Sequence, residues 1–159
     1  MIDIRIEADQ ARDLTIVNIL GLPDAQALID LHYRPEYGTT RRVVWDYRHA
    51  SLSELTLENL IRIAENTQAT DHTRKTEALA LVVRDEDELL LVKLYTEISL
   101  RMFDKTIHYL VTRSMDEAML WIEGLDLQGF PKPPTAPGRV GPGGDADADT
   151  VAQTICPAR

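Results

Sequence analysis

Cysteine is nearly absent from this sequence of 159 residues, and the single copy, Cys156, has no second cysteine with which to form an intramolecular disulfide. Long hydrophobic runs are missing too. The longest, at 79–83 and 89–92, fall far short of the roughly 20 apolar residues that cross a membrane. The N-terminus lacks the basic start, apolar run and small-residue cleavage site of a secretion signal. These absences predict a cytoplasmic protein with no membrane span.

Basic residues are fewer than acidic ones. The chain has 17 basic and 26 acidic residues, which gives a net charge of −9 at neutral pH. A protein of this sign repels phosphate backbones and anionic lipid headgroups. We therefore expect no binding to nucleic acid.

Signatures of catalysis are also missing. The four histidines, His32, His49, His72 and His108, do not have the spacing of metal ligands. The sequence contains no G-x-S-x-G, no glycine-rich phosphate loop and no H-E-x-x-H pair. The sequence thus predicts a protein that is not an enzyme and that carries no metal and no cofactor.

The first half of the chain has sequence patterns that predict three strands and one helix. Ile2, Ile4 and Ile6 alternate with charged residues, which predicts a strand paired in a hairpin with a second strand at 14–20. Asp24 can cap a helix whose inward face includes Ala25, Leu28, Ile29 and His32, and which ends before Pro35. The short apolar segment 41–47 predicts a strand that is buried on both faces.

Strands and helices alternate in the second half. Thr56 can cap a helix that runs to about residue 69, with Leu57, Leu60, Ile61 and Ala64 as its apolar stripe. A buried strand at 77–84 leads into a helix at about 85–103, which begins with four acidic residues. A strand at 106–111 and a helix capped by Ser114 and ending at Gly124 complete the pattern.

The order β-β-α-β-α-β-α-β-α predicts an α/β fold, with one mixed, mostly parallel five-stranded sheet and four helices. We expect one domain at residues 1–124. Residues 125–159 are rich in proline, glycine and aspartate and poor in large apolar side chains, so we expect them to form a flexible tail.

Over residues 2–123 this pattern resembles the SpoIIAA-like, or STAS-like, group of small bacterial proteins. That group is related to anti-sigma factor antagonists and distantly to the SEC14 lipid-binding architecture. The resemblance implies a regulatory, protein-binding module with a signalling or anti-sigma-like partner. It rests on the hairpin, VVWDYR at Val43–Arg48, LTLENL at Leu55–Leu60, LALVV at 79–83, the helix with Arg101-Met102-Phe103, and DEAMLWI at Asp116–Ile122.

Antagonist members of that family carry an Asp-Ser-Ser-Gly segment at the N-terminus of the helix that follows the third strand. The matching stretch here, His49 to Leu55, contains Ser51 and Ser53 but neither the Asp-Ser pair nor the glycine. A phosphate at a helix N-terminus meets free N–H groups and the positive end of the helix dipole. Ser51 and Ser53 are therefore candidate regulatory phosphosites, with ordinary loop and capping roles as the alternative. With Leu57, they form the predicted partner-binding segment.

Two further sites follow from the pattern. Asp46 follows a buried strand and lies near the carboxyl end of the sheet, where open α/β folds bind ligands. It is therefore a candidate ligand residue and, with His49, a candidate catalytic pair. The apolar stripe of the 85–103 helix could line a pocket for a small, lipid-like ligand, pack a homodimer, or simply pack the core. Its residues are Leu91, Leu94, Tyr95, Ile98 and Met102.

Overall fold

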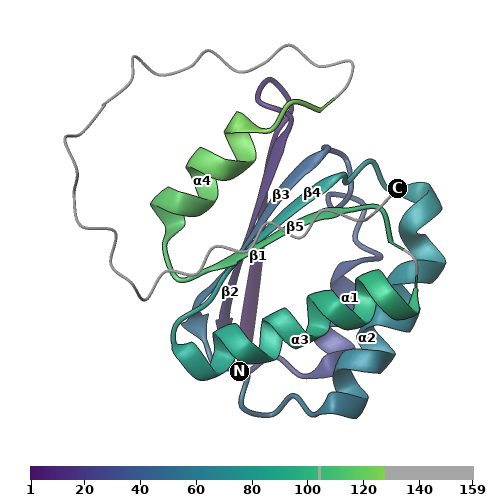
Figure 1. The fold of residues 1–159 in the computed structure, drawn as a ribbon, viewed down its shortest axis with the longest axis vertical. Helices are drawn as coiled ribbons and strands as arrows, with labels where there is room; N and C mark the ends of the chain where they lie inside the picture. The colour runs from purple at the N-terminus through teal and green to yellow at the C-terminus, as the bar shows by residue number, and fades with distance from the viewer. Residues whose placement is uncertain (104, 128–159) are drawn as a thin grey trace.

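The computed structural model describes residues 1–103 and 105–127, so nearly all of the predicted tail lies outside the described residues. One sheet contains all five strands, in the spatial order β1-β2-β3-β4-β5 (Figure 1). The first pair is antiparallel and the other three are parallel, which confirms the predicted mixed sheet with four helices. The elements are β1 (Ile2–Asp9), β2 (Leu14–Gly21), α1 (Ala25–Leu31), β3 (Arg42–Ala50), α2 (Leu57–Thr70), the 3-10 turn η1 (Asp71–Thr73), β4 (Ala78–Val82), α3 (Glu86–Met102), β5 (His108–Thr112) and α4 (Met115–Gly124).

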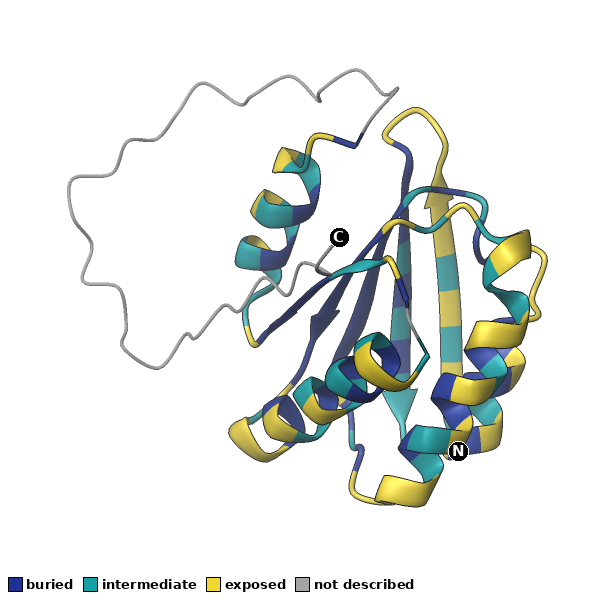
Figure 2. Cartoon of the chain, turned by 45° about the vertical axis from the view of Figure 1, so that its right-hand side comes forward, coloured by how far each residue is buried: buried dark blue, intermediate teal, exposed yellow. Residues whose placement is uncertain are grey.

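Helices cover the two faces of the sheet unequally. Figure 1 shows α1, α2 and α3 on one face and α4 alone on the other. The larger core lies under the three helices, and α4 covers a smaller core over β3, β4 and β5. Figure 2 shows the central strands buried, whereas residues along β1 alternate between exposed and partly buried. This alternation is the one predicted from the isoleucines of β1, because one of its faces has no helix above it.

The predicted helix caps are confirmed. Asp24, Thr56 and Ser114 each accept a hydrogen bond from the backbone N–H three residues further on. Asp85 caps α3 in the same way. Each of these bonds satisfies an N–H group that has no partner within its own helix. Packing against α4 also continues to Leu127, three residues past the predicted end of the domain.

β3 is longer than the 41–47 segment that the sequence predicts. It runs to Ala50, and its pairing with β2 contains a bulge, because Asn18 lies opposite Asp46 but Leu20 lies opposite His49. The extra residue resets the alternation of side chains, so Ala50 packs in the same core as Tyr47. Asp46 therefore lies in the middle of the strand, and the prediction that it follows the strand was wrong.

The buried face of α3 differs from the predicted stripe. Leu94 is 44% exposed and Met102 is 60% exposed, so neither of them covers the sheet. Three polar residues, Glu88, Thr96 and Ser99, are buried in their place. A pattern of apolar residues misses this face because polar side chains can be buried when they bond nearby, as Thr96 does to the carbonyl of Lys93.

Leu57 also differs from the apolar stripe predicted for α2. It is 55% exposed, in the first turn of the helix. The buried residues of α2 are Leu60, Ile63, Ala64 and Thr67. An exposed leucine in the first turn of α2 leaves that turn free to contact another molecule.

Candidate functional site

Hollows around the sheet, in the part of the chain that the structure describes, include an inner cavity and two crevices. The inner cavity, between the sheet and α1, α2 and α3, has a volume of about 30 Å³. The carboxyl-end crevice, of about 290 Å³, lies where β3 and β4 end and includes Ser51–Ser53, Leu55, Arg84, Asp85, Asp87, Glu88 and Leu91. The amino-end crevice, of about 580 Å³, lies where β3, β4 and β5 begin; its lining is Arg41, Gln68, Asp71, His72, Arg74–Glu77, Phe103, Thr106 and Ile107.

A buried carboxylate organises the carboxyl-end crevice. Glu88 is only 6% exposed, and its Oε1 accepts hydrogen bonds from the backbone N–H of Leu52, at 3.0 Å, and from Arg84, at 3.1 Å. Its Oε2 accepts a longer bond, of 3.4 Å, from the backbone N–H of Arg84. Glu88 thus connects the loop after β3, the loop after β4 and the first turn of α3. Hydrogen bonds to a charged acceptor are stronger than neutral ones, so this connection is firm.

Backbone bonds fix the rest of the loop between β3 and α2. The N–H of Ser51 donates to the carbonyl of Gly21 at 2.8 Å, and the N–H of Leu55 donates to the carbonyl of Leu52 at 3.0 Å. The side chain of Leu52 is buried in the inner cavity. The loop is therefore held by its backbone bonds and by the buried side chains of Leu52 and Leu55.

The structure brings the predicted partner-binding residues together on this loop. The hydroxyl of Ser51 donates to the hydroxyl of Ser53 at 3.2 Å, and Ser53 is exposed. The N-terminus of α2 is already capped, because the hydroxyl of Thr56 accepts from the N–H of Asn59 and the amide oxygen of Asn59 accepts from the N–H of Thr56. A phosphate on either serine would find that part of the helix end occupied.

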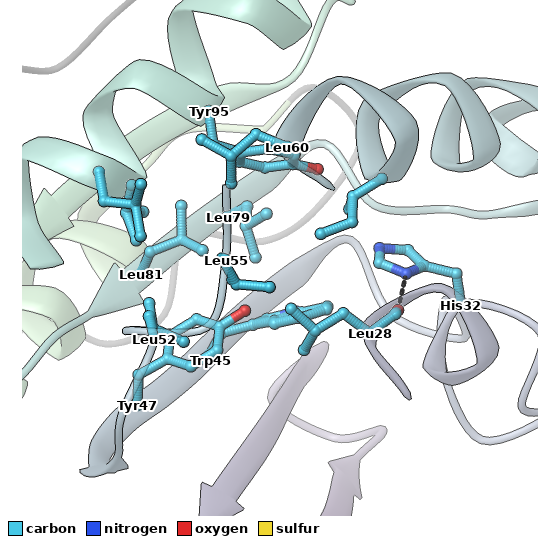
Figure 3. A pocket seen from close by; sticks show the side chains of 13 residues that line it. Leu28, His32, Trp45, Tyr47, Leu52, Leu55, Leu60, Leu79, Leu81 and Tyr95 are labelled. Carbon is cyan, nitrogen blue, oxygen red and sulfur yellow. Dashed lines mark hydrogen bonds between the residues drawn. The ribbon is translucent and has the colours of Figure 1, made fainter. Parts of the chain in front are cut away.

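The inner cavity is apolar and small (Figure 3). Most of its lining consists of leucines from α1, α2, α3, β4 and the loop after β3, with Trp45, Tyr47, Tyr95 and His32 between them. Burial raises the pKa of Tyr47 and of Tyr95, so both phenols stay neutral. About 30 Å³ is room for one or two water molecules, whereas pockets for drug-sized ligands usually measure about 300–1,000 Å³.

His32 is a buried neutral histidine. Its Nδ1 lies 2.7 Å from the carbonyl oxygen of Leu28 (Figure 3). Its ring packs against Tyr37 and Trp45. Burial, with a further contribution from the charges of Arg74 and Lys105, lowers the pKa of His32 from 6.5 to about 3. The carbonyl bond thus comes from a protonated Nδ1 on a neutral ring. The sequence placed His32 correctly on the inward face of α1.

The residues predicted to form a ligand pocket do not gather in one place. Leu91 and Tyr95 line the inner cavity, and Ile98 lies elsewhere in the same core. Leu94 and Met102 are exposed on α3, outside the cavity. The sequence missed the leucines of the loop after β3, because they meet the sheet only after the chain has folded.

The carboxylate of Asp46 is bonded to Arg48, which lies two residues further along the chain. Its two carboxylate oxygens accept hydrogen bonds from the guanidinium of Arg48 at 2.9 and 2.8 Å, and one of them also accepts from the backbone N–H of Arg48. Burial alone raises the pKa of Asp46, but the bonds from Arg48 outweigh that effect and hold it below its ordinary value. Asp46 is buried, His49 is exposed, and neither side chain lines any of the three hollows. No polar cleft joins the two within the described residues.

Other chemistry finds little support in the part of the chain that the structure describes. Over residues 1–103 and 105–127, no group of three or more His, Cys, Asp or Glu side chains could hold a metal ion. No helix in the same ranges is both long enough and apolar enough to cross a membrane.

Comparison with known proteins yields one structural neighbour to report. No family model matches the chain, and no curated protein matches its sequence. A crystal structure of an uncharacterised protein of the DUF3478 family from Shewanella loihica, described as having a SpoIIAA-like fold, is similar in fold. The match covers 76% of this chain and 93% of the other, with 14% identity and a TM-score of 0.43.

Proposed function

We propose that this chain is a non-catalytic, cytoplasmic regulatory module of the STAS-like type, which binds a protein partner through the loop after β3 and the first turn of α2. The observation that carries the proposal is the bond from the backbone N–H of Leu52 to the buried carboxylate of Glu88. It holds the loop in one shape while Ser53 and Leu57 remain exposed on its outer side. A preformed loop loses little conformational entropy on binding.

The charge around this loop indicates the kind of partner. The carboxyl-end crevice contains three carboxylates, those of Asp85, Asp87 and Glu88, and one guanidinium, that of Arg84. A partner with a basic side chain for the crevice and an apolar side chain for Leu57 fits this surface. A phosphate on Ser53 would add a charge of about −1.5 to −2 beside Glu54 and these carboxylates. Phosphorylation would then strengthen docking, because the added negative charge attracts the basic side chain of such a partner.

A photo-crosslinking amino acid at position 57 tests the proposal. The matched control is the same amino acid at position 120, because Leu120 is 76% exposed on α4, on the other face of the sheet. We expect a discrete protein adduct in lysate of the source cells at position 57 only, and a stronger adduct when Ser53→Glu is added. Equal labelling from positions 57 and 120, or no discrete adduct from 57, would contradict the proposal.

A carrier of a small apolar ligand is the second candidate, and the apolar lining of the inner cavity favours it. The cavity holds about 30 Å³, so a lipid-sized ligand would require α3 to move away from the sheet. Native mass spectrometry after incubation with fatty acids tests this candidate. A stoichiometric adduct that Leu91→Trp abolishes supports it, whereas a protein that stays free of ligand contradicts it.

A further inference from the structure

Positive charge collects at one place in a chain whose net charge is −9. The amino-end crevice contains the cationic side chains of Arg41, Arg74 and Lys75, and it contains the carboxylates of Asp71 and Glu77. Arg41 precedes β3, whereas the other four lie together at 71–77, in η1 and in the loop before β4. The crevice is therefore more cationic than the molecule around it.

A fourth cation lies behind the crevice. The Nζ of Lys105 is 2.6 Å from the hydroxyl of Thr67 and 3.1 Å from Oδ2 of Asp71. The guanidinium of Arg74 bonds to Oδ1 of the same Asp71 and, at 2.6 Å, to the carbonyl of Thr67. The side chains of Lys105 and Arg74 are 2% and 7% exposed, so two buried cations share one carboxylate.

The position of Arg74 is tightly defined. Its guanidinium carbon lies 5.6 Å from the centre of the Tyr37 ring. Gly38 has a φ of +83°, and a Cβ at that position would lie 2.5 Å from Cγ of Arg74. The glycine thus provides both the turn and the space for the arginine.

Two buried donors at this crevice are unused. Nε of Arg74 and the hydroxyl of Thr76 have no hydrogen-bond partner among the described residues, and both residues line the crevice. A buried polar atom without a partner costs about 1–3 kcal/mol, so native structures rarely keep one without a reason. A bound acceptor would satisfy these donors and balance the extra positive charge.

The surroundings suit a small molecule. The crevice measures about 580 Å³, within the range of ligand sites, and Phe103 and Ile107 give it an apolar wall. Lys75 and His72 are exposed, and neither has an ion pair among the described residues. The crevice therefore combines buried donors, an exposed lysine at the rim and an apolar surface.

We propose that the amino-end crevice binds the phosphate group of a small soluble molecule, with Arg74 and Thr76 as buried donors and Lys75 as the cation at the rim. A phosphate fits better than a single carboxylate because it offers more acceptor oxygens and more charge to several separate donors. The site lies at the opposite end of the sheet from the proposed partner surface. An experiment that contradicts one of these two proposals therefore leaves the other unaffected.

Titration of the ¹⁵N-labelled protein with inorganic pyrophosphate tests the site. We expect saturable shifts of backbone amide signals at 71–77 and 105–107, and none at 51–57. Lys75→Gln should weaken binding about tenfold, the loss of one charge-assisted contact, and Thr76→Val should weaken it by a smaller factor. Both residues lie at the surface of the crevice, so these variants spare the buried Arg74.

Arg5→Gln is the matched control, because Arg5 is an exposed arginine on β1, at the far edge of the sheet. It should leave pyrophosphate binding unchanged. Shifts spread over the whole surface, an equal loss in Arg5→Gln and Lys75→Gln, or no saturation by about 10 mM would overturn the proposal. Equally tight binding of succinate would overturn the assignment to phosphate.

Discussion

The two ends of the sheet carry opposite charge and use it differently. At the carboxyl end, one buried carboxylate, Glu88, bonds to backbone N–H groups and fixes a loop. At the amino end, two buried cations, Arg74 and Lys105, share the single carboxylate of Asp71 and leave a donor unused. The carboxyl end is thus satisfied by its own chain, whereas the amino end has capacity left for a ligand.

This difference matters because open α/β folds usually bind ligands at the carboxyl ends of their strands. Here the carboxyl end has an ordered loop with exposed Ser53 and Leu57, which suits a macromolecular surface. The larger hollow and the surplus positive charge lie at the amino end. The position of the side chains, and not the end of the sheet, decides where a ligand fits.

The largest effect should come from removing the shared carboxylate at the amino end. Asp71→Asn leaves Arg74 and Lys105 close together without a counter-ion, which should cost about 3 kcal/mol of unfolding free energy in urea. Asp3→Asn, which breaks the exposed pair with Arg5, is the control and should cost less than about 0.5 kcal/mol. Adding Lys105→Met to Asp71→Asn should restore much of the loss. Equal effects of the two single variants would show that the buried cations are not the source of strain.

The pH dependence of stability should reflect His32, which lies near the amino-end cations. Its pKa is about 3 in the folded protein and 6.5 ordinarily, so the unfolded chain takes up a proton first as the pH falls. The contribution of His32 is complete above pH 6.5 and declines between pH 6.5 and 3, by about 2.7 kcal/mol at pH 4.5. Urea unfolding at several pH values measures this slope. His32→Gln should flatten it, and an unchanged slope would contradict a neutral buried His32.

At the carboxyl end, the loss of Glu88 should have a smaller effect. Glu88→Ala leaves the buried N–H of Leu52 without its acceptor and should cost about 1.5 kcal/mol in urea unfolding. Hydrogen exchange at the amide of Leu52 should accelerate as the loop loosens. Asp87→Ala, on the exposed side of the same helical turn, is the control. Unchanged exchange at Leu52 would show that Glu88 does not hold the loop.

The smallest effect on stability is expected for Leu57→Asp. Because the side chain is 55% exposed, the unfolding free energy should change by less than about 0.5 kcal/mol. Leu60→Asp, at a buried position of the same helix, is the contrast and should unfold the protein or cost several kcal/mol. A large loss of stability in Leu57→Asp would mean that this leucine serves the core and not a partner surface.

Much of the fold could be predicted because its signals are local. The alternation of isoleucines in β1, the caps at Asp24 and Thr56 and the doubly buried β3 depend on neighbours in the sequence. The prediction of the buried face of α3 was wrong in part, because a periodic pattern considers apolar residues alone. It therefore placed Leu94 inward, although that leucine is exposed.

The sites, too, could be predicted where their signal is local and could not be predicted where it is not. The sequence identified the segment with Ser51, Ser53 and Leu57, because a loop before a capped helix is recognisable locally. It could not identify Glu88, whose partner Leu52 is 36 residues away, or the meeting of Lys105 with Thr67 across 38 residues. Asp46 was singled out for its place near the end of a strand, and a bulge with a neighbouring arginine gave it a different role.

By itself, the sequence determined the order of strands and helices, the mixed sheet and the buried face of α1, because periodicity and capping act within a few residues. Only the tertiary structure decided which charges meet. Asp71 and Arg74 flank one short turn, but Lys105 lies 34 residues after Asp71. The shared carboxylate, the burial of both cations and the unused donor exist only once the strands that follow them are side by side. Electrostatic energy depends on distance through space and on burial, and neither can be read along the chain.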